Sequence, residues 1–210
     1  MELVMGLYEQ LVNRGAFTGK QMKTINAFTT SASGSYLSTP FFCGDSLIAT
    51  DTFTAVRLKK DTALQTYFDN DSEFAYKIPD SVLKKTLVSD VYCFANYERD
   101  VDSDIVKYPK GKDPEHTAMR PIKELKTTGD QVISMFEDSG QILNPDEVEA
   151  MHLSGFNPKF MKQICELMEA FNVNCFNFNW YKFNNAAIIK VVCPSYPELS
   201  VLICPMKDKH

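Results

Sequence analysis

The sequence has few of the residues from which metal and redox sites are built. Only three of its 210 residues are histidine, and its six cysteines include no C-x-x-C pair. Most of the cysteines stand inside apolar runs, as in Phe42-Cys43 and Ile164-Cys165, where a reduced thiol packs as a small hydrophobic group. We therefore expect neither a zinc site nor a redox dithiol, and no cofactor.

Motifs that bind phosphates or metal ions are missing as well. No P-loop, no G-x-G-x-x-G and no H-E-x-x-H occurs. An acidic run at residues 100–111 has aspartate at calcium-loop positions one, three and five, but isoleucine replaces the required glycine and glycine the required glutamate. This run is expected to be a solvated turn between two strands, and the protein is expected not to be an enzyme.

Long apolar runs and a basic leader are also absent. No stretch approaches the roughly 20 apolar residues of a membrane span, and Glu2 and Glu9 stand where a signal peptide would be basic. We expect a cytoplasmic protein without a membrane partner. A net charge of −5 argues against nucleic-acid binding over the whole surface and leaves room for a local basic strip.

One tetrapeptide suggests catalysis. Gly44-Asp45-Ser46-Leu47 spells the nucleophile block of GDSL esterases. Such an enzyme needs a base beside Ser46, and its C-terminal Asp-x-x-His is not matched here, because Asp208 lies two residues before His210. A Gly-Asp pair between apolar runs is also typical of a tight hairpin turn. The esterase is kept as a distant alternative to that turn.

The periodicity predicts an α+β protein with more strands than helices. Helices are expected at 3–12, from Thr18 to Phe28, after Pro79 and across 157–171. The main strands are expected at 41–43, 46–59, 73–78, 130–138, 147–156, 176–180, 186–194 and 199–206, and two more within 90–108 around the acidic turn. The proline-rich segment 108–121 is the candidate linker, which divides the chain into domains 1–110 and 111–210. A weak repeat, strand and then proline-started helix, suggests that the two domains are similar.

Lysines recur on the polar faces of the expected helices. The six are Lys20, Lys23, Lys84, Lys85, Lys159 and Lys162. A solvated helix surface explains them, and Glu166 and Glu169 interrupt the basic strip. Lysines at such positions also bind DNA phosphates as point charges without reading bases. Both interpretations stay open at this point.

Four segments, in order and spacing, resemble bacterial DNA polymerase III beta subunits, the sliding clamps. "SLIATDTFTAVRLKK" resembles the Ala-Thr-Asp-Gly-His-Arg-Leu segment, and "YKIPDSVLKKTL" the step that follows it. "EAMHLSGFNPKFMKQICELM" is similar to the strand that enters the last helix of the clamp, and "LSVLICPMKDKH" to the C-terminal Met-Pro-Met-Arg-Leu. The resemblance covers roughly residues 18–100 and 128–207, and the first helix has no counterpart.

This resemblance implies a DNA-clamp-like fold and a non-catalytic role. Clamps are rings of six similar domains that hold a polymerase on duplex DNA through phosphate contacts without sequence specificity. They also bind peptide motifs of polymerases and clamp loaders in an apolar pocket. Carried over, that pocket involves Thr50, Leu202, Pro205 and Met206, with Cys204 where the family has its first methionine.

The departures from the family bear on assembly and on the pocket. Thr52-Phe53-Thr54-Ala55 replaces the Gly-His-Arg-Leu run. With room for only two domains, the chain would close a six-domain ring as a homotrimer, or form an open dimer, or stay monomeric. We expect a clamp-like processivity factor; the alternative is a clamp-fold interaction protein that binds a replication partner without encircling DNA.

Overall fold

The fold is described from a computed structural model of the chain. The residues that the structure describes are 16–32, 35–59, 75–78, 83, 91–93, 98–99, 106–107, 121–138, 140–150, 153–155, 157–183 and 186–207. The expected helices at 3–12 and after Pro79, together with Lys84 and Lys85, lie outside these residues, except for Leu83.

The first described elements are a short strand and a capped helix. Thr18 ends β1 (Ala16–Thr18) and is the N-cap of α2 (Gly19–Asn26). Its Oγ1 accepts a hydrogen bond of 3.2 Å from the Gln21 amide, and Gln21 Oε1 accepts one of 3.0 Å from the Thr18 amide. These reciprocal bonds satisfy two amides that the helix cannot pair internally. The expected helix start at Thr18 is confirmed.

The expected strands of the first half of the chain are also present. They are β2 (Phe41–Cys43), β3 (Ser46–Thr50), β4 (Thr54–Lys59), β5 (Ala75–Lys77), β6 (Val91–Cys93), β7 (Glu98–Arg99) and β8 (Val106–Lys107). Gly44, with a φ of 55°, occupies the turn between β2 and β3, a conformation that glycine adopts without steric cost. Gly44-Asp45 is therefore a hairpin turn, as the alternative to the esterase required.

A helix replaces the strand that we expected at 130–138, so that prediction is wrong. After β9 (Pro121–Ile122), α6 runs from Lys123 to Glu137, and its buried residues Leu125, Gly129, Val132 and Phe136 recur at helical spacing. A Cβ on Gly129 would lie 2.5 Å from Cys43 Sγ, so glycine lets α6 approach β2 closely.

The expected strand at 147–156 is only partly present. The chain forms β10 (Gln141–Ile142), then the short helix α7 (Pro145–Ala150), and only then β11 (Leu153–Gly155). The later predictions are confirmed: α8 (Pro158–Ala170), with Asn157 as its N-cap, β12 (Asn177–Phe183), β13 (Ala186–Val192) and β14 (Leu199–Ile203). The chain then forms β15 (Met206–Lys207), which pairs with β11.

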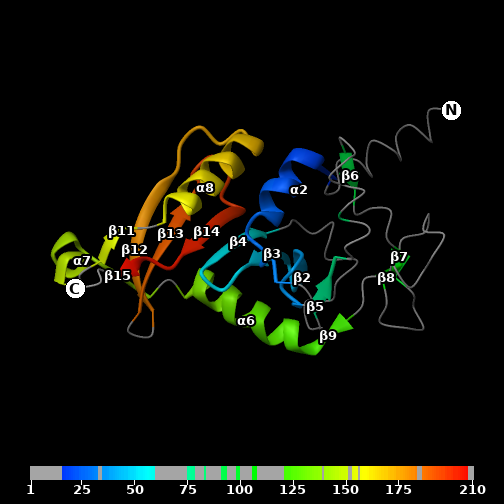
Figure 1. The fold of residues 1–210 in the computed structure, drawn as a ribbon, viewed down its shortest axis with the longest axis horizontal. Coiled ribbons are helices and arrows are strands. Elements are labelled where there is room, and N and C mark those ends of the chain that lie inside the picture. The colour runs from blue at the N-terminus through cyan, green and yellow to red at the C-terminus, as the bar shows by residue number, and fades with distance from the viewer. Residues whose placement is uncertain are drawn as a thin grey trace.

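The main sheet runs through both halves of the chain. Its order is β10-β12-β13-β14-β4-β3-β2-β5-β9, and every pair in it is antiparallel. The two halves meet where β14 pairs with β4, with Ile203 opposite Thr54 and Leu199 opposite Leu58. Figure 1 shows these strands side by side between the helices. The expected α+β class is thus confirmed.

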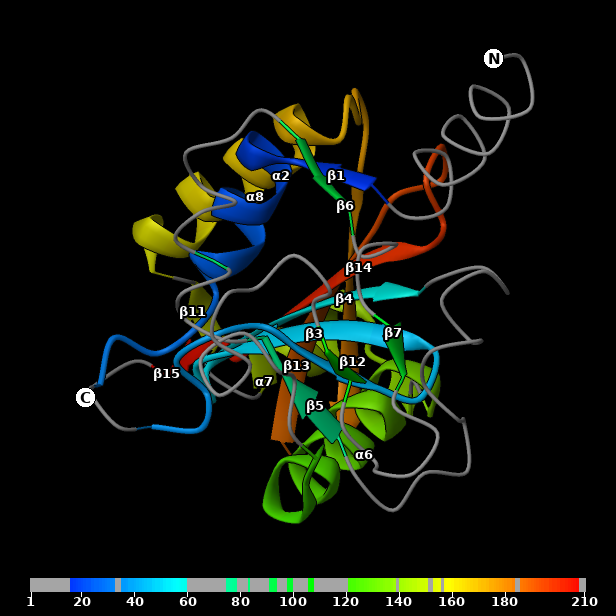
Figure 2. The ribbon, with the colours of Figure 1, turned by 90° about the vertical axis from the view of Figure 1, so that its right-hand side faces the viewer.

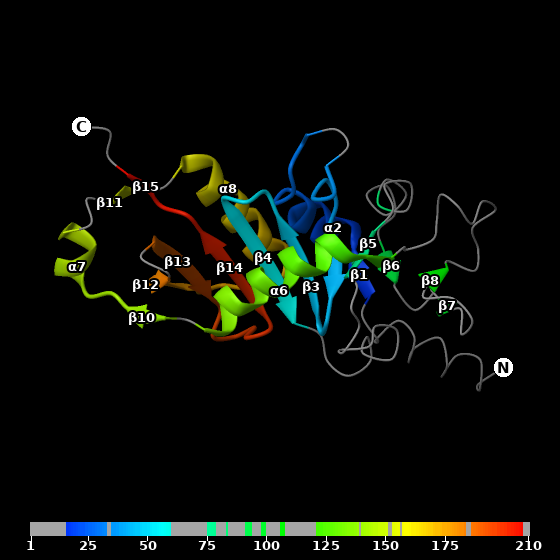
Figure 3. The same cartoon turned by 90° about the horizontal axis from the view of Figure 1, so that it is seen from below.

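Helices cover both faces of this sheet. α2 and α8 lie side by side over one face, whereas α6 lies on the other (Figure 2) and crosses the strands in the view from below (Figure 3). Side chains alternate along β3 accordingly: Leu47 and Ala49 pack in the cluster beneath α2 and α8, and Ile48 in the cluster beneath α6. Each cluster contains residues from both halves of the chain. The division into domains 1–110 and 111–210 stays a prediction.

Candidate functional site

The turn between β3 and β4 is held by side-chain hydrogen bonds. Asp51 Oδ1 accepts from the amides of Phe53 (3.0 Å) and Thr54 (2.7 Å) and from Thr54 Oγ1 (2.9 Å). Thr50 Oγ1 donates to the Thr54 carbonyl at 2.7 Å and accepts from the Thr52 amide at 3.1 Å. The Ala-Thr-Asp segment is therefore a rigid corner, because its two polar side chains bind the backbone of the turn.

Thr52 adopts an unusual backbone conformation at this corner. Its φ is 77°, in the left-handed region that β-branched residues rarely occupy. The sliding-clamp segment that this stretch resembles has glycine at that position. Thr52 thus adopts the backbone conformation that glycine would favour. The hydrogen bonds of Thr50 and Asp51 hold the turn in this conformation in spite of its steric cost.

A pocket of about 200 Å³, here called the Thr50 pocket, opens beside this corner. Three parts of the chain line it. The turn and β4 contribute Thr50, Thr52, Phe53, Thr54 and Ala55; α6 contributes Thr128, Gln131, Val132 and Met135; β13, β14 and the residue after it contribute Ile188, Leu202, Ile203 and Cys204. No charged side chain is among these lining residues. A pocket of this size and lining suits one apolar side chain of a ligand.

The structure brings together three of the five residues expected in the peptide pocket. Thr50, Leu202 and Cys204 line the same cavity. Pro205 is half-buried and follows directly, but it is not a lining residue, and Met206 lies in β15, where its side chain is not described. Burial, and then the carboxylate of Asp51, raise the pKa of Cys204, so its thiol remains protonated at neutral pH.

Sequence reasoning missed the wall that α6 provides. Val132 and Met135 were expected on a strand, but they lie on α6 and line the same pocket as Leu202. The expected strand gave no reason to place them in this pocket. Phe53 was also missed as a site residue, although it stands inside the altered Gly-His-Arg-Leu run. Its side chain is 63 % exposed and lines the Thr50 pocket and a second, larger pocket.

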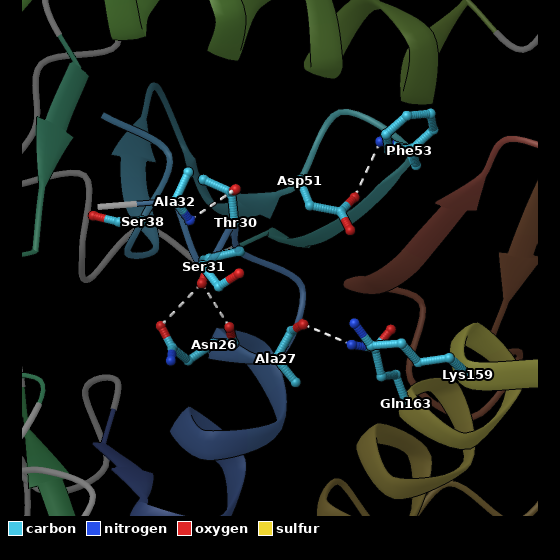
Figure 4. Close-up of a pocket in the computed structure, with 11 residues that line it drawn as sticks. Asn26, Ala27, Thr30, Ser31, Ala32, Ser38, Asp51, Phe53, Lys159 and Gln163 are labelled. Carbon is cyan, nitrogen blue, oxygen red and sulfur yellow. Dashed lines mark hydrogen bonds between the residues drawn. The ribbon is translucent and has the colours of Figure 1, made fainter. Parts of the chain in front are cut away.

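That second pocket, of about 720 Å³, lies between the helices α2 and α8 and the same turn (Figure 4). We call it the Asn26 pocket. Asn26 and Ala27 come from the end of α2, Lys159 and Gln163 from α8, and Asp51 and Phe53 from the turn. Gln163 Nε2 donates to the Ala27 carbonyl at 2.7 Å and so joins the two helices. Gln163 Oε1 is buried and has no hydrogen-bond partner among the residues that the structure describes.

The structure places four of the six candidate lysines on two adjacent helices. Lys20 and Lys23 lie on α2, and Lys159 and Lys162 on α8, and all four are exposed. Lys84 and Lys85 lie outside the described residues.

Two of these four lysines are paired with glutamates of α8. Lys20 Nζ lies 2.7 Å from Glu169 Oε1, and Lys162 Nζ lies 3.8 Å from Glu166 Oε1. The hydrogen bond from Lys20, followed by its charge, lowers the pKa of Glu169. Within the described part of the chain, Lys23 and Lys159 make no ion pair. The exposed face of α2 and α8 therefore mixes both signs of charge.

Ser46, the candidate nucleophile of the esterase alternative, is buried in the β2–β3 hairpin. Only 1 % of it is exposed. Its Oγ donates to Asp45 Oδ1 at 2.7 Å and accepts from Arg57 Nε at 2.8 Å. The hydroxyl thus belongs to a structural network around Arg57, and a substrate could not reach it without unfolding the hairpin.

Two absences concern the described residues alone. They contain no group of three or more His, Cys, Asp or Glu side chains that could hold a metal ion. None of the helices among them is long and apolar enough to cross a membrane. Of the cysteines that the sequence placed in apolar runs, Cys43 and Cys193 are buried, whereas Cys165 is exposed, because it lies on the outer face of α8.

Comparisons with known proteins found distant structural neighbours only. No protein-family model and no curated protein matches the sequence. Among solved structures, the DNA polymerase III beta subunit of Thermotoga maritima matches with a TM-score of 0.49 and 10 % identity. The beta chain of Streptococcus pneumoniae TIGR4 follows with 0.45 and 12 %, and the sliding clamp of Bacillus subtilis with 0.44 and 11 %.

In each case the match covers 92 % of this chain and 64 % of the other, so the chain spans less than two thirds of these proteins. All three neighbours are DNA polymerase III beta subunits or sliding clamps, the family that the four sequence segments resemble.

Proposed function

We propose that the protein is a sliding-clamp-like accessory factor that docks replication proteins and holds them on duplex DNA without sequence specificity. Its catalytic partner would contribute a peptide whose apolar side chain enters the Thr50 pocket. The protein itself would supply no chemistry. Several copies, or a trimer if the chain supplies two of six domains, would be needed to surround the duplex.

The Thr50 pocket is the observation that carries this proposal. The sequence resemblance assigned peptide binding to two segments, the Ala-Thr-Asp turn and the end of the chain. Thr50 and Cys204, one from each segment, line one uncharged cavity. The left-handed Thr52 stands where the family segment has glycine. Phe53 joins this cavity to the Asn26 pocket, so a peptide could extend beyond its first anchor.

The DNA-holding part of the proposal is supported by the α2 and α8 lysines. Lysine ammonium groups on exposed helices contact phosphates as point charges, and such contacts give salt-sensitive binding without base readout. Lys20, Lys23, Lys159 and Lys162 lie on neighbouring helices and on the same side of the sheet.

Peptide binding is tested with an array of 15-residue peptides that tile the replicative polymerase of the same organism. Peptides that bind are then titrated by fluorescence anisotropy against the Phe53→Ala and Met135→Glu variants. Both changes are expected to weaken binding by about tenfold or more, since one removes an apolar anchor and the other puts a charge into an uncharged cavity.

The control for these variants is Ile142→Ala, which removes an exposed apolar side chain on the edge strand β10, separated from β4 by three strands of the sheet. Its affinity should equal that of the unchanged protein. Peptides that bind equally to all variants would show that the Thr50 pocket is not the docking site.

A second candidate is a clamp-fold interaction protein that binds a replication partner but does not encircle DNA. The Lys20–Glu169 and Lys162–Glu166 pairs favour it, because they place negative charge on the face that would meet phosphates. Retention of the protein on DNA separates the two candidates, because a ring stays on closed circular DNA and slips off after the circle is cut.

The oligomeric state gives a second test. Light scattering over a concentration series measures the mass in solution, and a trimer would favour the ring.

A further inference from the structure

A third cavity lies at the other end of strands β4 and β14 and shares no lining residue with the Thr50 pocket. Its volume is about 300 Å³, and we call it the Arg57 pocket. Arg57, Lys59 and Lys190 line it together with one carboxylate, that of Glu198. The rest of the lining includes Phe136, Pro194 and Pro197. Positive charge and apolar surface therefore occur in one small cavity.

Arg57 is fixed in place but retains hydrogen-bonding capacity. Its side chain is 7 % exposed. Nε donates to Ser46 at 2.8 Å, and Nη2 donates to Asp45 at 3.3 Å and to Glu137 at 2.8 Å. These bonds leave Nη1 without a partner among the described residues. A guanidinium offers five N–H donors in a fixed plane, so the remaining edge suits a carboxylate.

Lys190 places a second cation beside this guanidinium. Its Nζ donates to the Phe136 carbonyl at 2.6 Å and lies 6.0 Å from the ring centre of Tyr181. Burial, and after it the charge of Arg57, lower the pKa of Lys190, although Glu137 acts in the opposite direction. Both causes disfavour the charged form of Lys190, and an anion placed beside its ammonium group and Arg57 would favour that form.

The carboxylates of the protein that lie near Arg57 do not neutralise both cations. Asp45 is shared between Arg57 and Lys59, at 3.3 and 3.4 Å. Glu137 meets Arg57 with a side chain that is 57 % exposed, where solvent weakens the interaction. Arg57 meets Glu137 and Lys190 donates to the Phe136 carbonyl, so both cations lie at the last turn of α6, where positive charge is favourable.

We propose that the Arg57 pocket binds an organic anion, a carboxylate attached to a small apolar group. The carboxylate would accept hydrogen bonds from Arg57 and Lys190, and the apolar group would lie against Pro194 and Pro197. This site is separate from the Thr50 pocket, and the inference does not depend on the proposed clamp function.

The test uses 3-phenylpropionate and its neutral amide as matched probes, titrated into the full chain by calorimetry and by NMR. The carboxylate is expected to bind saturably and the amide at least tenfold more weakly, because only the carboxylate is a charged acceptor for Arg57. Equal binding of acid and amide would overturn the proposal.

Two variants locate the binding. Lys190→Met keeps the apolar stem and removes the charge. It should weaken binding of 3-phenylpropionate by about tenfold and leave binding of the amide unchanged. Glu198→Gln changes an exposed side chain and removes the repelling carboxylate, so it should tighten binding. Because Glu198→Gln acts at the surface, it also tests the site if Lys190→Met loses structure. Unchanged carboxylate affinity in Glu198→Gln would count against the pocket.

A capped peptide, acetyl-Gly-Asp-Phe-Gly-amide, distinguishes the natural source of such a ligand. Its aspartate and phenylalanine offer the same two groups on an otherwise neutral backbone. Tighter binding than phenylpropionate indicates an acidic peptide of a partner, and weaker binding indicates a free small molecule. Failure of both probes to bind would refute the proposal.

Discussion

The amide of Cys204 donates a hydrogen bond of 2.8 Å to the carbonyl of Phe53. This contact joins the residue after β14 to the turn between β3 and β4, so two of the three parts of the chain that line the Thr50 pocket are hydrogen-bonded to each other. We therefore expect a change in the turn to affect Cys204 as well.

Thr52→Gly is expected to stabilise the protein. A left-handed conformation costs a non-glycine residue roughly 1–2 kcal/mol, and the greater freedom of glycine in the unfolded chain offsets roughly 0.5–1 kcal/mol of the gain. The expected net rise in the free energy of unfolding is about 0.5–1 kcal/mol, measured by chemical denaturation. Thr52→Ala, which still has a Cβ, is the control and should not be stabilised; a stabilised alanine variant would contradict the backbone explanation.

Gly129→Ala is expected to destabilise the protein even though alanine is the better helix former. The helix preference favours alanine by about 1 kcal/mol, but the new methyl would lie 2.5 Å from Cys43 Sγ. Overpacking of this kind costs roughly 1–3 kcal/mol. We expect a net loss, measured from the urea midpoint, that is partly recovered when Cys43→Ala is added. A double-mutant cycle compares the free energies of unfolding of the two single variants and the double variant. If the two changes add without coupling, α6 does not pack on β2 at this point.

Asp45 should make part of the free energy of unfolding sensitive to acid. Burial alone would raise the pKa of this carboxyl, but the hydrogen bond from Ser46 and the charges of Arg57 and Lys59 outweigh it and lower the pKa below its usual 3.8. A lowered pKa in the folded state means that the stabilisation is present above the unfolded value and is lost as pH falls through the folded value. The loss should therefore occur below about pH 4.

Asp45→Asn should remove this part of the acid sensitivity, seen as a flatter dependence of the guanidinium midpoint on pH below about 4. Asp138→Asn, a change of an exposed carboxylate that no ion pair holds among the described residues, is the control. Identical pH profiles for Asp45→Asn and the unchanged protein would rule out this contribution.

Glu169→Gln tests whether the α2 and α8 lysines meet DNA. It releases Lys20 from its ion pair at a site that is 73 % exposed, so the free energy of unfolding should hardly change. If the face contacts phosphates, affinity for a short duplex should rise a few-fold and depend more steeply on salt. Fluorescence anisotropy measures both, with Glu147→Gln on α7 as control. An unchanged affinity would place the DNA contact elsewhere or favour the non-encircling candidate.

Local patterns predicted much of this fold. The capping residues Thr18 and Asn157, the glycine turn at Gly44 and the alternation along β3 are encoded within a few residues. α6 was missed because the segment from Asp130 to Asp138 holds two apolar pairs, Val132-Ile133 and Met135-Phe136, that also fit a strand. The helical spacing becomes visible only when Leu125 and Gly129 are included, and Gly129 itself weakens helix propensity until Cys43 gives it a packing role.

The site was predictable only in part for a related reason. Thr50, Leu202 and Cys204 followed from the family resemblance, and their meeting depends on the pairing of β4 with β14. No local signal encodes a contact between segments so distant in sequence. The contribution of α6 to the pocket and the gathering of Arg57 and Lys190 are likewise consequences of tertiary packing alone.

The pairing of β4 with β14 also sets an order of events during synthesis. β4 leaves the ribosome long before β14, its neighbour in the centre of the sheet. Until β14 arrives, the nascent hairpin of β3 and β4 presents an unpaired apolar edge, which is a template for pairing with other chains. Productive expression should therefore depend on conditions that protect this edge, such as slower translation at low temperature or a chaperone that binds nascent chains.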